Sequence, residues 1–191
     1  MTRRRAFAAF ACLLLALSLW QAGAGAYIHV KAGLAQILID DAWRRTQAGD
    51  ISARPWPWAD TRPLARLEIP HLDASLIVLS GSSGRTLAFG PGHVDGSVLP
   101  GQLGVSLIAG HRDTHFRLLE GLAVGETIII EDREGIRHGF KVTATRIVDA
   151  RRVRINVDAT KPRLVLSTCY PFDAIDPGGP LRFLVVADLY D

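Results

Sequence analysis

From Leu64 onward the chain alternates short apolar or β-branched runs with turns rich in glycine and proline. Runs with the composition of strands occupy residues 64–69, 74–79, 106–109, 127–131, 140–148, 164–168 and 182–189. Turn signals such as Gly81-Ser82-Ser83-Gly84 and Gly178-Gly179-Pro180 separate them. A short helix is expected only at 116–122, where apolar residues recur at spacing three. Seven or eight short strands with such turns predict a mainly β domain, either a barrel or a sandwich.

The N-terminus carries a different signal, which is a long stretch without charge. Residues 6–26 contain no charged side chain and follow Arg3, Arg4 and Arg5. At about 1.5 Å per residue such a helix spans about 30 Å, close to the thickness of a bilayer core. The stretch is a transmembrane anchor or a signal peptide, since Ala22-Gly23-Ala24 and Ala24-Gly25-Ala26 both resemble cleavage sites. Both alternatives place the rest of the chain across the membrane, with the arginines inside.

Residues 27–63 connect this stretch to the β domain. Apolar positions at helical spacing predict an amphipathic helix over 28–48. The prolines within 54–63 exclude a central strand, and Trp56 and Trp58 are expected to pack against the following domain. We therefore expect three parts: an anchor or signal segment at 1–26, a juxtamembrane helix and linker at 27–63, and a β domain at 64–191.

Charge and cysteine content narrow the possible functions. The net charge is +3, and Arg3 to Arg5 supply positive charge ahead of the apolar stretch, so the remainder is nearly neutral. No nucleic acid partner is expected from such a balance. Of the two cysteines, Cys12 lies inside the apolar stretch, which leaves Cys169 without a disulfide partner. An unpaired thiol in an oxidising compartment is normally either buried or used in chemistry.

Three strand-like runs each deliver one reactive side chain: His111, Cys169 and Arg182. A thiolate is a nucleophile, a histidine can carry a proton to a leaving amine, and an arginine can stabilise a developing oxyanion. If the last two strands pair antiparallel, Cys169 and Arg182 fall at the same end of the sheet. The alternatives are a buried structural cysteine, a histidine in a turn and an arginine at a solvated strand edge.

Other signatures of reactive sites are incomplete. His111 and His115 are four residues apart, but Arg112 stands where zinc peptidases have a glutamate, so we expect no metal. The glycine-rich stretch 90–96 lacks the spacing of a dinucleotide-binding loop, and residues 81–84 lack that of a serine hydrolase.

At these residues the chain resembles the sortases, which are membrane-anchored cysteine transpeptidases. The sortase nucleophile lies in a motif that matches Leu166-Ser167-Thr168-Cys169, the histidine follows Ala109-Gly110, and the arginine opens the next strand as Arg182 does. Stretches 55–60, 87–93 and 169–172 are most similar to the proteobacterial sortases, also called the GN or marine type. The resemblance covers residues 55–191 and implies an eight-stranded β-barrel with short helices.

The resemblance also implies a reaction and its partners. Cys169 would attack an LPXTG-like C-terminal sorting signal on a secreted protein and form a thioester. His111 would transfer protons, and Arg182 would position the signal and stabilise the oxyanion. The amine acceptor, peptidoglycan or another protein, stays open. Residues expected to support the site by contacting substrate or the catalytic groups are Thr168, His93, Asp113 and Tyr170.

The expected setting is the inner membrane of a Gram-negative cell, with a single-pass anchor and the catalytic domain on the periplasmic side. Neither a cofactor nor calcium is expected, since no acidic loop cluster is evident. Two other functions stay open at this point: an exported cysteine hydrolase with water as acceptor, and a non-catalytic exported β-domain.

Overall fold

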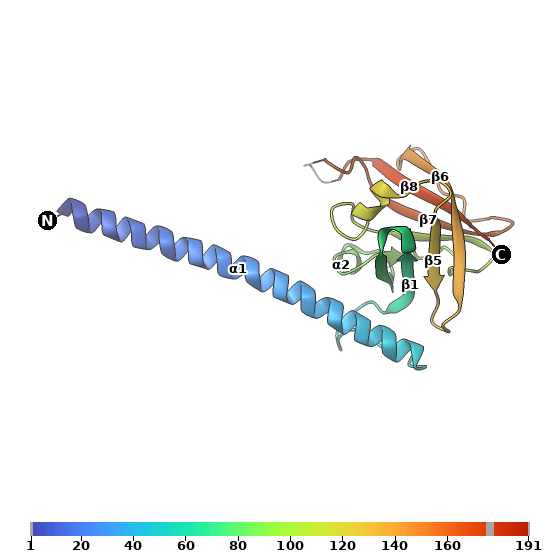
Figure 1. The fold of residues 1–191 in the computed structure, drawn as a ribbon, viewed down its shortest axis with the longest axis horizontal. Helices are drawn as coiled ribbons and strands as arrows, with labels where there is room; N and C mark the ends of the chain where they lie inside the picture. Colours follow the sequence, from blue (N-terminus) through green and yellow to red (C-terminus); the bar gives the residue numbers. More distant parts are fainter. Residues whose placement is uncertain (1, 175–177, 191) are drawn as a thin grey trace. The chain divides into compact units, whose positions relative to one another are not determined.

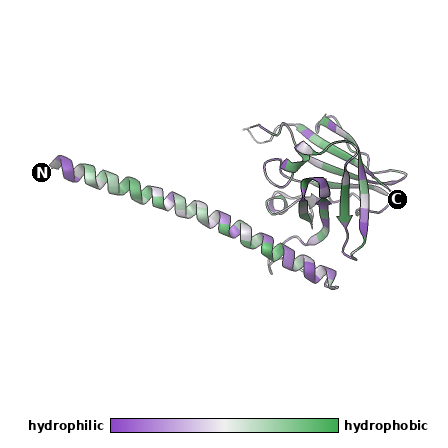
Figure 2. Cartoon of the chain, in the orientation of Figure 1, coloured by the Kyte–Doolittle hydropathy of each residue, from purple (hydrophilic) through white to green (hydrophobic). Residues whose placement is uncertain are grey.

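A computed structural model of the chain describes residues 2–174 and 178–190. The chain forms two compact units, Met1–Ile37 and Leu38–Asp191. The first unit is the N-terminal part of one helix, α1 (Thr2–Gln47) (Figure 1). Figure 2 shows hydrophobic residues following one another along that part of the helix, which is long and apolar enough to cross a membrane by length and composition.

Helix α1 runs without a break through both segments that the sequence suggested separately. Gly23 and Gly25 lie inside it with open space around them. A glycine in a helix costs only about 1 kcal/mol relative to alanine, which is too little to end a long helix. The helix ends before Gly49, which has a φ of +100° that favours glycine.

The last turns of α1 belong to the second unit. Ile39, Ala42 and Trp43 are buried there, and the guanidinium of Arg66 lies 5.9 Å from the centre of the Trp43 ring. Gln47 Nε2 also donates to the main-chain oxygen of Asp132 at 3.0 Å. The end of the helix is therefore part of the β domain in packing terms.

The linker after the helix only partly follows the expectation for its tryptophans. Trp56 packs edge-on against Phe89, with the ring centres 4.9 Å apart, as predicted. Trp58 is 82% exposed, so the prediction that it packs against the domain is wrong. Residues 55–58 form bends and a turn, which the Ala59 amide closes by donating to the Trp56 oxygen at 3.0 Å, and the Trp58 ring is left in solvent.

Within the described residues, eight strands close into a barrel in the order β1-β2-β3-β4-β7-β8-β6-β5 (Figure 1). The strands are β1 (Pro63–Ile69), β2 (Ala74–Ser80), β3 (Gly92–His93), β4 (Gly104–Ala109), β5 (Thr127–Glu131), β6 (Arg137–Asp149), β7 (Pro162–Cys169) and β8 (Leu181–Leu189). The short helices are η1 (Pro70–Leu72), α2 (Gly84–Leu87) and η2 (Arg117–Gly121). The mainly β class and the barrel are confirmed.

Side chains along β4, β7 and β8 alternate between the inner and outer faces of the barrel. Both faces of this three-stranded part, the β4-β7-β8 wall, are apolar. Leu164, Leu166 and Val185 point into the barrel and are fully buried there. The intervening residues form a second cluster on the outer face, which contains Val105, Val165 and Leu184 and is partly covered by Ile155 and Ala159. The covering segment, 150–161, connects β6 to β7, and its Val157 oxygen accepts a hydrogen bond from the Val105 amide at 2.9 Å.

Candidate active site

Cys169 and Arg182 are direct cross-strand partners. Strands β7 and β8 pair antiparallel, and the last residue of β7, Cys169, lies opposite Arg182. In such pairs the Cβ atoms are about 5 Å apart and point to the same face of the sheet. By alternation with Leu166 and Val185, both side chains belong to the outer face. The expectation that antiparallel pairing brings these two residues to one end of the sheet is confirmed.

His111 reaches the same end from the other side of β7. Strand β4 runs parallel to β7, with Ala109 opposite Ser167, and the Gly110 amide donates to the Ser167 oxygen at 3.1 Å. His111 follows Ala109 by two positions, as Cys169 follows Ser167. The imidazole is exposed. The ends of three adjacent strands in the order β4-β7-β8 therefore carry histidine, cysteine and arginine.

Thr168 connects the ends of β7 and β4 by a hydrogen bond on the inner face. Its side chain is 2% exposed, and its hydroxyl donates to the main-chain oxygen of Gly110 at 2.8 Å. The bond joins the residue before the thiol to the residue before the histidine. Thr168 is thus in place to hold the two candidate catalytic residues in register, while its hydroxyl points away from the outer face.

Gly110 has a steric reason to be glycine. A Cβ built on it would lie 2.7 Å from the ring of Phe116, which is fully buried. The Phe116 amide in turn donates to the His111 oxygen at 2.9 Å and closes the turn that follows the histidine. The small residue lets the phenyl ring pack directly against the backbone from which His111 projects.

Arg112 is a residue whose structural role the sequence did not reveal. It is 8% exposed, and its Nη2 donates to the main-chain oxygen of Ala174 at 2.7 Å. Ala174 lies in the segment between Cys169 and Arg182. The arginine therefore ties the turn after β4 to the connection after β7. The only sequence signal for this role is the position of Arg112 directly after His111. The polar His-Arg-Asp stretch gives no indication that the side chain is buried.

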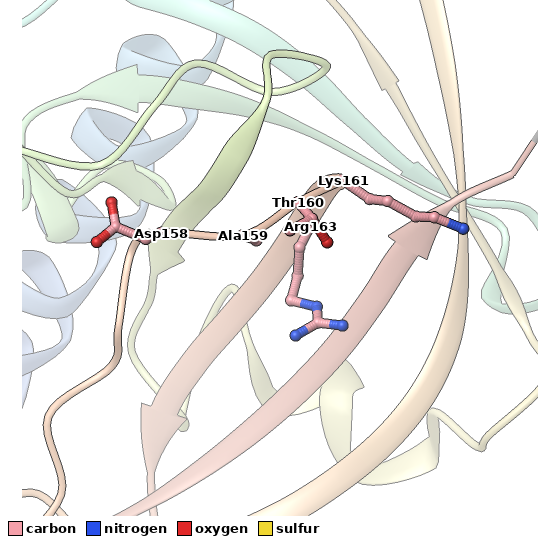
Figure 3. A pocket seen from close by; sticks show the side chains of 5 residues that line it. All are labelled: Asp158, Ala159, Thr160, Lys161 and Arg163. Atoms are coloured by element: carbon pink, nitrogen blue, oxygen red, sulfur yellow. The ribbon is translucent and has the colours of Figure 1, made fainter.

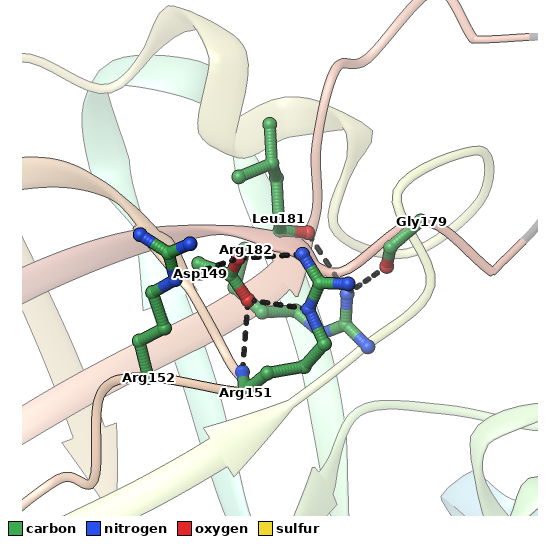
Figure 4. A network of polar contacts seen from close by, with 6 residues as sticks. All are labelled: Asp149, Arg151, Arg152, Gly179, Leu181 and Arg182. Carbon is green, nitrogen blue, oxygen red and sulfur yellow. Dashed lines mark hydrogen bonds and ion pairs between the residues drawn. The ribbon is translucent and has the colours of Figure 1, made fainter.

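The Arg182 side chain is held by main-chain oxygens. Its Nη1 donates to the oxygens of Gly179 at 2.6 Å and Leu181 at 2.8 Å (Figure 4). A guanidinium carries five N–H donors, and those on Nε and Nη2 take no part in these two bonds. Both acceptors are neutral, so the full positive charge of Arg182 is retained at the outer face.

A second charged group lies at the adjacent end of β6. Asp149 accepts three hydrogen bonds from Arg151, one from the main chain and two from the guanidinium (Figure 4). These bonds lower the pKa of Asp149 to about 2. The carboxylate is therefore ionised at any neutral pH and already paired.

His115 lies near His111 and is partly buried. Burial lowers its pKa below the usual value for histidine, and the neighbouring His111 lowers it further. His115 is thus biased toward the neutral imidazole. The spacing of the two histidines is visible in the sequence, but there it suggested only a zinc motif that Arg112 excludes.

The other three residues expected to support the site are His93, Tyr170 and Asp113, and their surroundings differ from one another. His93 is buried, and its Nε2 donates to the Val98 oxygen at 2.9 Å and lies 3.1 Å from Ser97 Oγ, so it braces the loop after β3. Tyr170 stacks on Phe183 with ring centres 6.5 Å apart, packed against the barrel core. Asp113 is exposed in the turn after His111.

A cavity of about 450 Å³ lies away from these residues. It is lined by Asp158, Ala159, Thr160, Lys161 and Arg163 (Figure 3). Arg163 stands six residues before Cys169 on β7, or about 20 Å along an extended strand. Its guanidinium is already bound to Asp188, with Nε 2.6 Å from Oδ1. Cys169 is thus remote from this cavity.

No group of three or more histidine, cysteine or acidic side chains in residues 2–174 and 178–190 is arranged to hold a metal ion. Cys12 and Cys169 are both free thiols.

Solved structures with the same barrel are sortases. Sortase A from Corynebacterium diphtheriae, in a lid mutant, superposes with a TM-score of 0.63 and 25% identity over 83% of this chain and 95% of that one. Sortase C from Clostridium perfringens, solved with the C-terminal cell wall sorting motif, gives a TM-score of 0.59 and 20% identity over 84% and 90%. The fold is therefore the sortase barrel.

The sequence comparison agrees. The sortase domain model matches residues 67–190, and the chain belongs to the sortase family. Sortase D of Bacillus subtilis (strain 168) is 32% identical over 120 residues, or 62% of this chain. The match spans about three fifths of that relative's length, 60%.

Proposed function

We propose that this chain is a membrane-anchored cysteine transpeptidase that cleaves an LPXTG-like C-terminal sorting signal and transfers the product to an amine. The observation that carries the proposal is that three adjacent strands end together. Cys169 lies opposite Arg182, and His111 follows the end of the neighbouring strand β4. Family membership supports it, as does the sorting motif present with the clostridial sortase C.

In the proposed first half-reaction, the Cys169 thiolate attacks the carbonyl carbon before the last residue of the motif. The Arg182 guanidinium, charged at any physiological pH, donates hydrogen bonds to the oxyanion of the tetrahedral intermediate. Protonated His111 gives its proton to the departing amine as the C–N bond breaks. A thioester between Cys169 and the substrate is left.

In the second half-reaction, neutral His111 takes a proton from the incoming amine, whose nitrogen attacks the thioester carbonyl. Collapse of this second intermediate breaks the C–S bond and returns the thiolate. Water in place of the amine gives hydrolysis by the same steps. The acceptor, peptidoglycan or a protein, determines the biological product.

The cellular setting belongs to the same proposal. The apolar length of α1 with three arginines ahead of it supports a single-pass anchor in the cytoplasmic membrane and a barrel on the outer side. The motifs around residues 87–93 and 169–172 support a proteobacterial sortase, so the barrel would face a periplasm.

The decisive experiment compares two cysteine variants of the full chain in detergent. With quenched LPXTG-type peptides and an added amine, wild type and Cys12→Ala should cleave alike, and Cys169→Ala should be inactive. Intact-protein mass spectrometry should show an acyl adduct that Cys169→Ala lacks. Cleavage retained in Cys169→Ala would refute the proposal, and hydrolysis with every amine tested would favour a hydrolase.

A further inference from the structure

The turn after β6 places an unusual density of positive charge next to the candidate nucleophile. Strands β6, β8 and β7 are neighbours, with Val148 opposite Arg182 and Arg182 opposite Cys169. At about 4.8 Å per strand, Val148 lies about 10 Å from Cys169. The segment that directly follows Val148 contains Asp149, Arg151, Arg152 and Arg154.

The backbone of this turn is fixed to the start of β8. The amides of Arg152 and Val153 both donate to the Asp149 oxygen, at 2.9 and 3.0 Å, and close the turn. The Ala150 amide donates to the Pro180 oxygen at 2.9 Å. The arginines of the turn therefore start from a position that is fixed relative to Arg182.

The positive charge here exceeds what the neighbouring carboxylate can neutralise. Arg151 occupies Asp149 with bonds to both oxygens, at 3.1 and 2.8 Å (Figure 4). Arg152 comes only within 4.0 Å of the same carboxylate, with its side chain 85% exposed. Arg154 is exposed as well, and Arg182 is bound to main-chain oxygens. Together, Arg151, Arg152, Arg154 and Arg182 with Asp149 carry a net charge of +3.

We propose that Arg152 and Arg154 form a subsite for a carboxylate of the substrate, so that this chain prefers sorting signals with an acidic residue close to the scissile bond. The inference rests on the proposed function. The turn begins at Val148, about 10 Å from Cys169, a distance that about three residues of extended peptide span, so we expect the acidic residue close to the attacked carbonyl. Because this positive charge lies next to Arg182 and Cys169, we assign it to binding of a peptide and not to binding of a membrane surface.

The test uses fluorescent LPXTG-type peptides that differ only in having glutamate, glutamine or lysine at the variable position. Binding to full-length Cys169→Ala in detergent avoids any dependence on turnover, and cleavage by the wild type is measured in parallel. Glutamate should bind about fivefold more tightly than glutamine, as expected for two exposed charge pairs, and lysine should bind least tightly. Raising the salt from 50 to 500 mM should reduce the difference.

The variants locate the effect. Arg152→Gln combined with Arg154→Gln should remove the preference for glutamate, whereas Arg85→Gln, whose side chain is 86% exposed, should retain it. Equal binding of the three peptides would overturn the subsite, even if the wild type cleaves all of them. Cleavage of none of them would contradict the proposed function, while the binding series would still decide the subsite. Loss of binding to anionic vesicles in the double variant, with the peptide preference unchanged, would assign the charge to a membrane and would also overturn it.

Discussion

Thr168 shows how a single buried hydroxyl can position two reactive groups. Its bond to the Gly110 oxygen, at 2.8 Å, joins β7 to the residue before His111. No other residue type of similar size offers both a donor and a methyl group that fits the barrel interior. A resemblance places threonine before the nucleophile, and the structure supplies its physical reason.

Replacing Thr168 by valine should therefore reduce stability and activity together. The Gly110 oxygen would be left buried without its partner, at a cost of about 1–3 kcal/mol. Denaturant unfolding measures the stability, and the rate of Cys169 alkylation measures the environment of the thiol. Thr168→Ser keeps the hydroxyl and should stay closer to wild type in both. Equal losses in the valine and serine variants would contradict a role for the hydrogen bond.

His115 makes stability depend on pH. Its pKa in the folded protein is below that of a free histidine, chiefly because of burial. Between that value and about 6.5, the unfolded chain binds more protons, so the folded state loses stability as pH falls. Wild type should thus lose thermal stability relative to His115→Gln when the pH is lowered from 8 to 5. A constant difference in melting temperature across this range would show that the imidazole does not titrate in this way.

At the scale of the element, the connection between β7 and β8 depends on Arg112. Its buried guanidinium holds the Ala174 oxygen at 2.7 Å from a turn 62 residues earlier in the chain. The start of the connection, at Ala174, is thereby tied to the turn that carries His111.

Arg112→Met should keep the volume of the side chain but lose this tie. Hydrogen bonds to a charged donor contribute about 1.5–3 kcal/mol, so peptide cleavage should fall at least about tenfold in kcat/KM. The exposed Arg117, the first residue of η2, is the matched control, and Arg117→Met should cleave like the wild type. Unchanged cleavage by Arg112→Met would exclude a positioning role.

The strands were more predictable from sequence than the contacts between them. Each of the seven expected runs has an observed strand, because alternating apolar residues and glycine or proline turns act locally. Strand β3 was missed because two residues, Gly92 and His93, carry no period. Helix α2 was also missed, because the sequence shows only a turn signal at 81–84, yet Ser83 caps the helix by accepting from the Thr86 amide at 3.2 Å.

The candidate site was predictable in its members but only partly in its support. His111, Cys169 and Arg182 each follow, end or open a predicted strand, whereas the antiparallel pairing of the last two strands was only a condition at the sequence level and is shown by the structure. The buried contacts of Arg112 and the packing of Phe116 on Gly110 depend on segments that meet only in three dimensions. A linear pattern contains no signal for them.

At the scale of the whole molecule, helix α1 belongs in part to each of the two compact units. Residues up to Ile37 form one unit, whereas the end of the helix contributes Ile39, Ala42 and Trp43 to the buried set of the other. The boundary that matters for folding thus lies inside a continuous helix. A cut at the end of the apolar stretch and a cut at the end of the helix would give different proteins.

A chain that starts at Leu38 should fold and cleave sorting-signal peptides like the full protein. A chain that starts at Ala48 should be less stable by several kcal/mol, since it loses the buried Trp43, and loss of a buried tryptophan side chain alone costs about 3–5 kcal/mol. Thermal unfolding of the two truncated proteins measures this difference. Equal stability would mean that the helix end contributes nothing to the barrel.

The position of Cys169 on the outside of the β4-β7-β8 wall separates two kinds of selection. Along β7 and β8, one set of residues packs in the barrel interior, and alternate residues such as Val165 and Leu184 pack in a second cluster beneath segment 150–161. Substitutions at Val165 or Leu184 would therefore leave cavities and destabilise the fold, although both lie on the same face as Cys169. A library intended to evolve new peptide specificity in this wall would start at Ser167, which lies on the outer face two residues before Cys169 and is only partly buried, and would leave the buried outer positions unchanged.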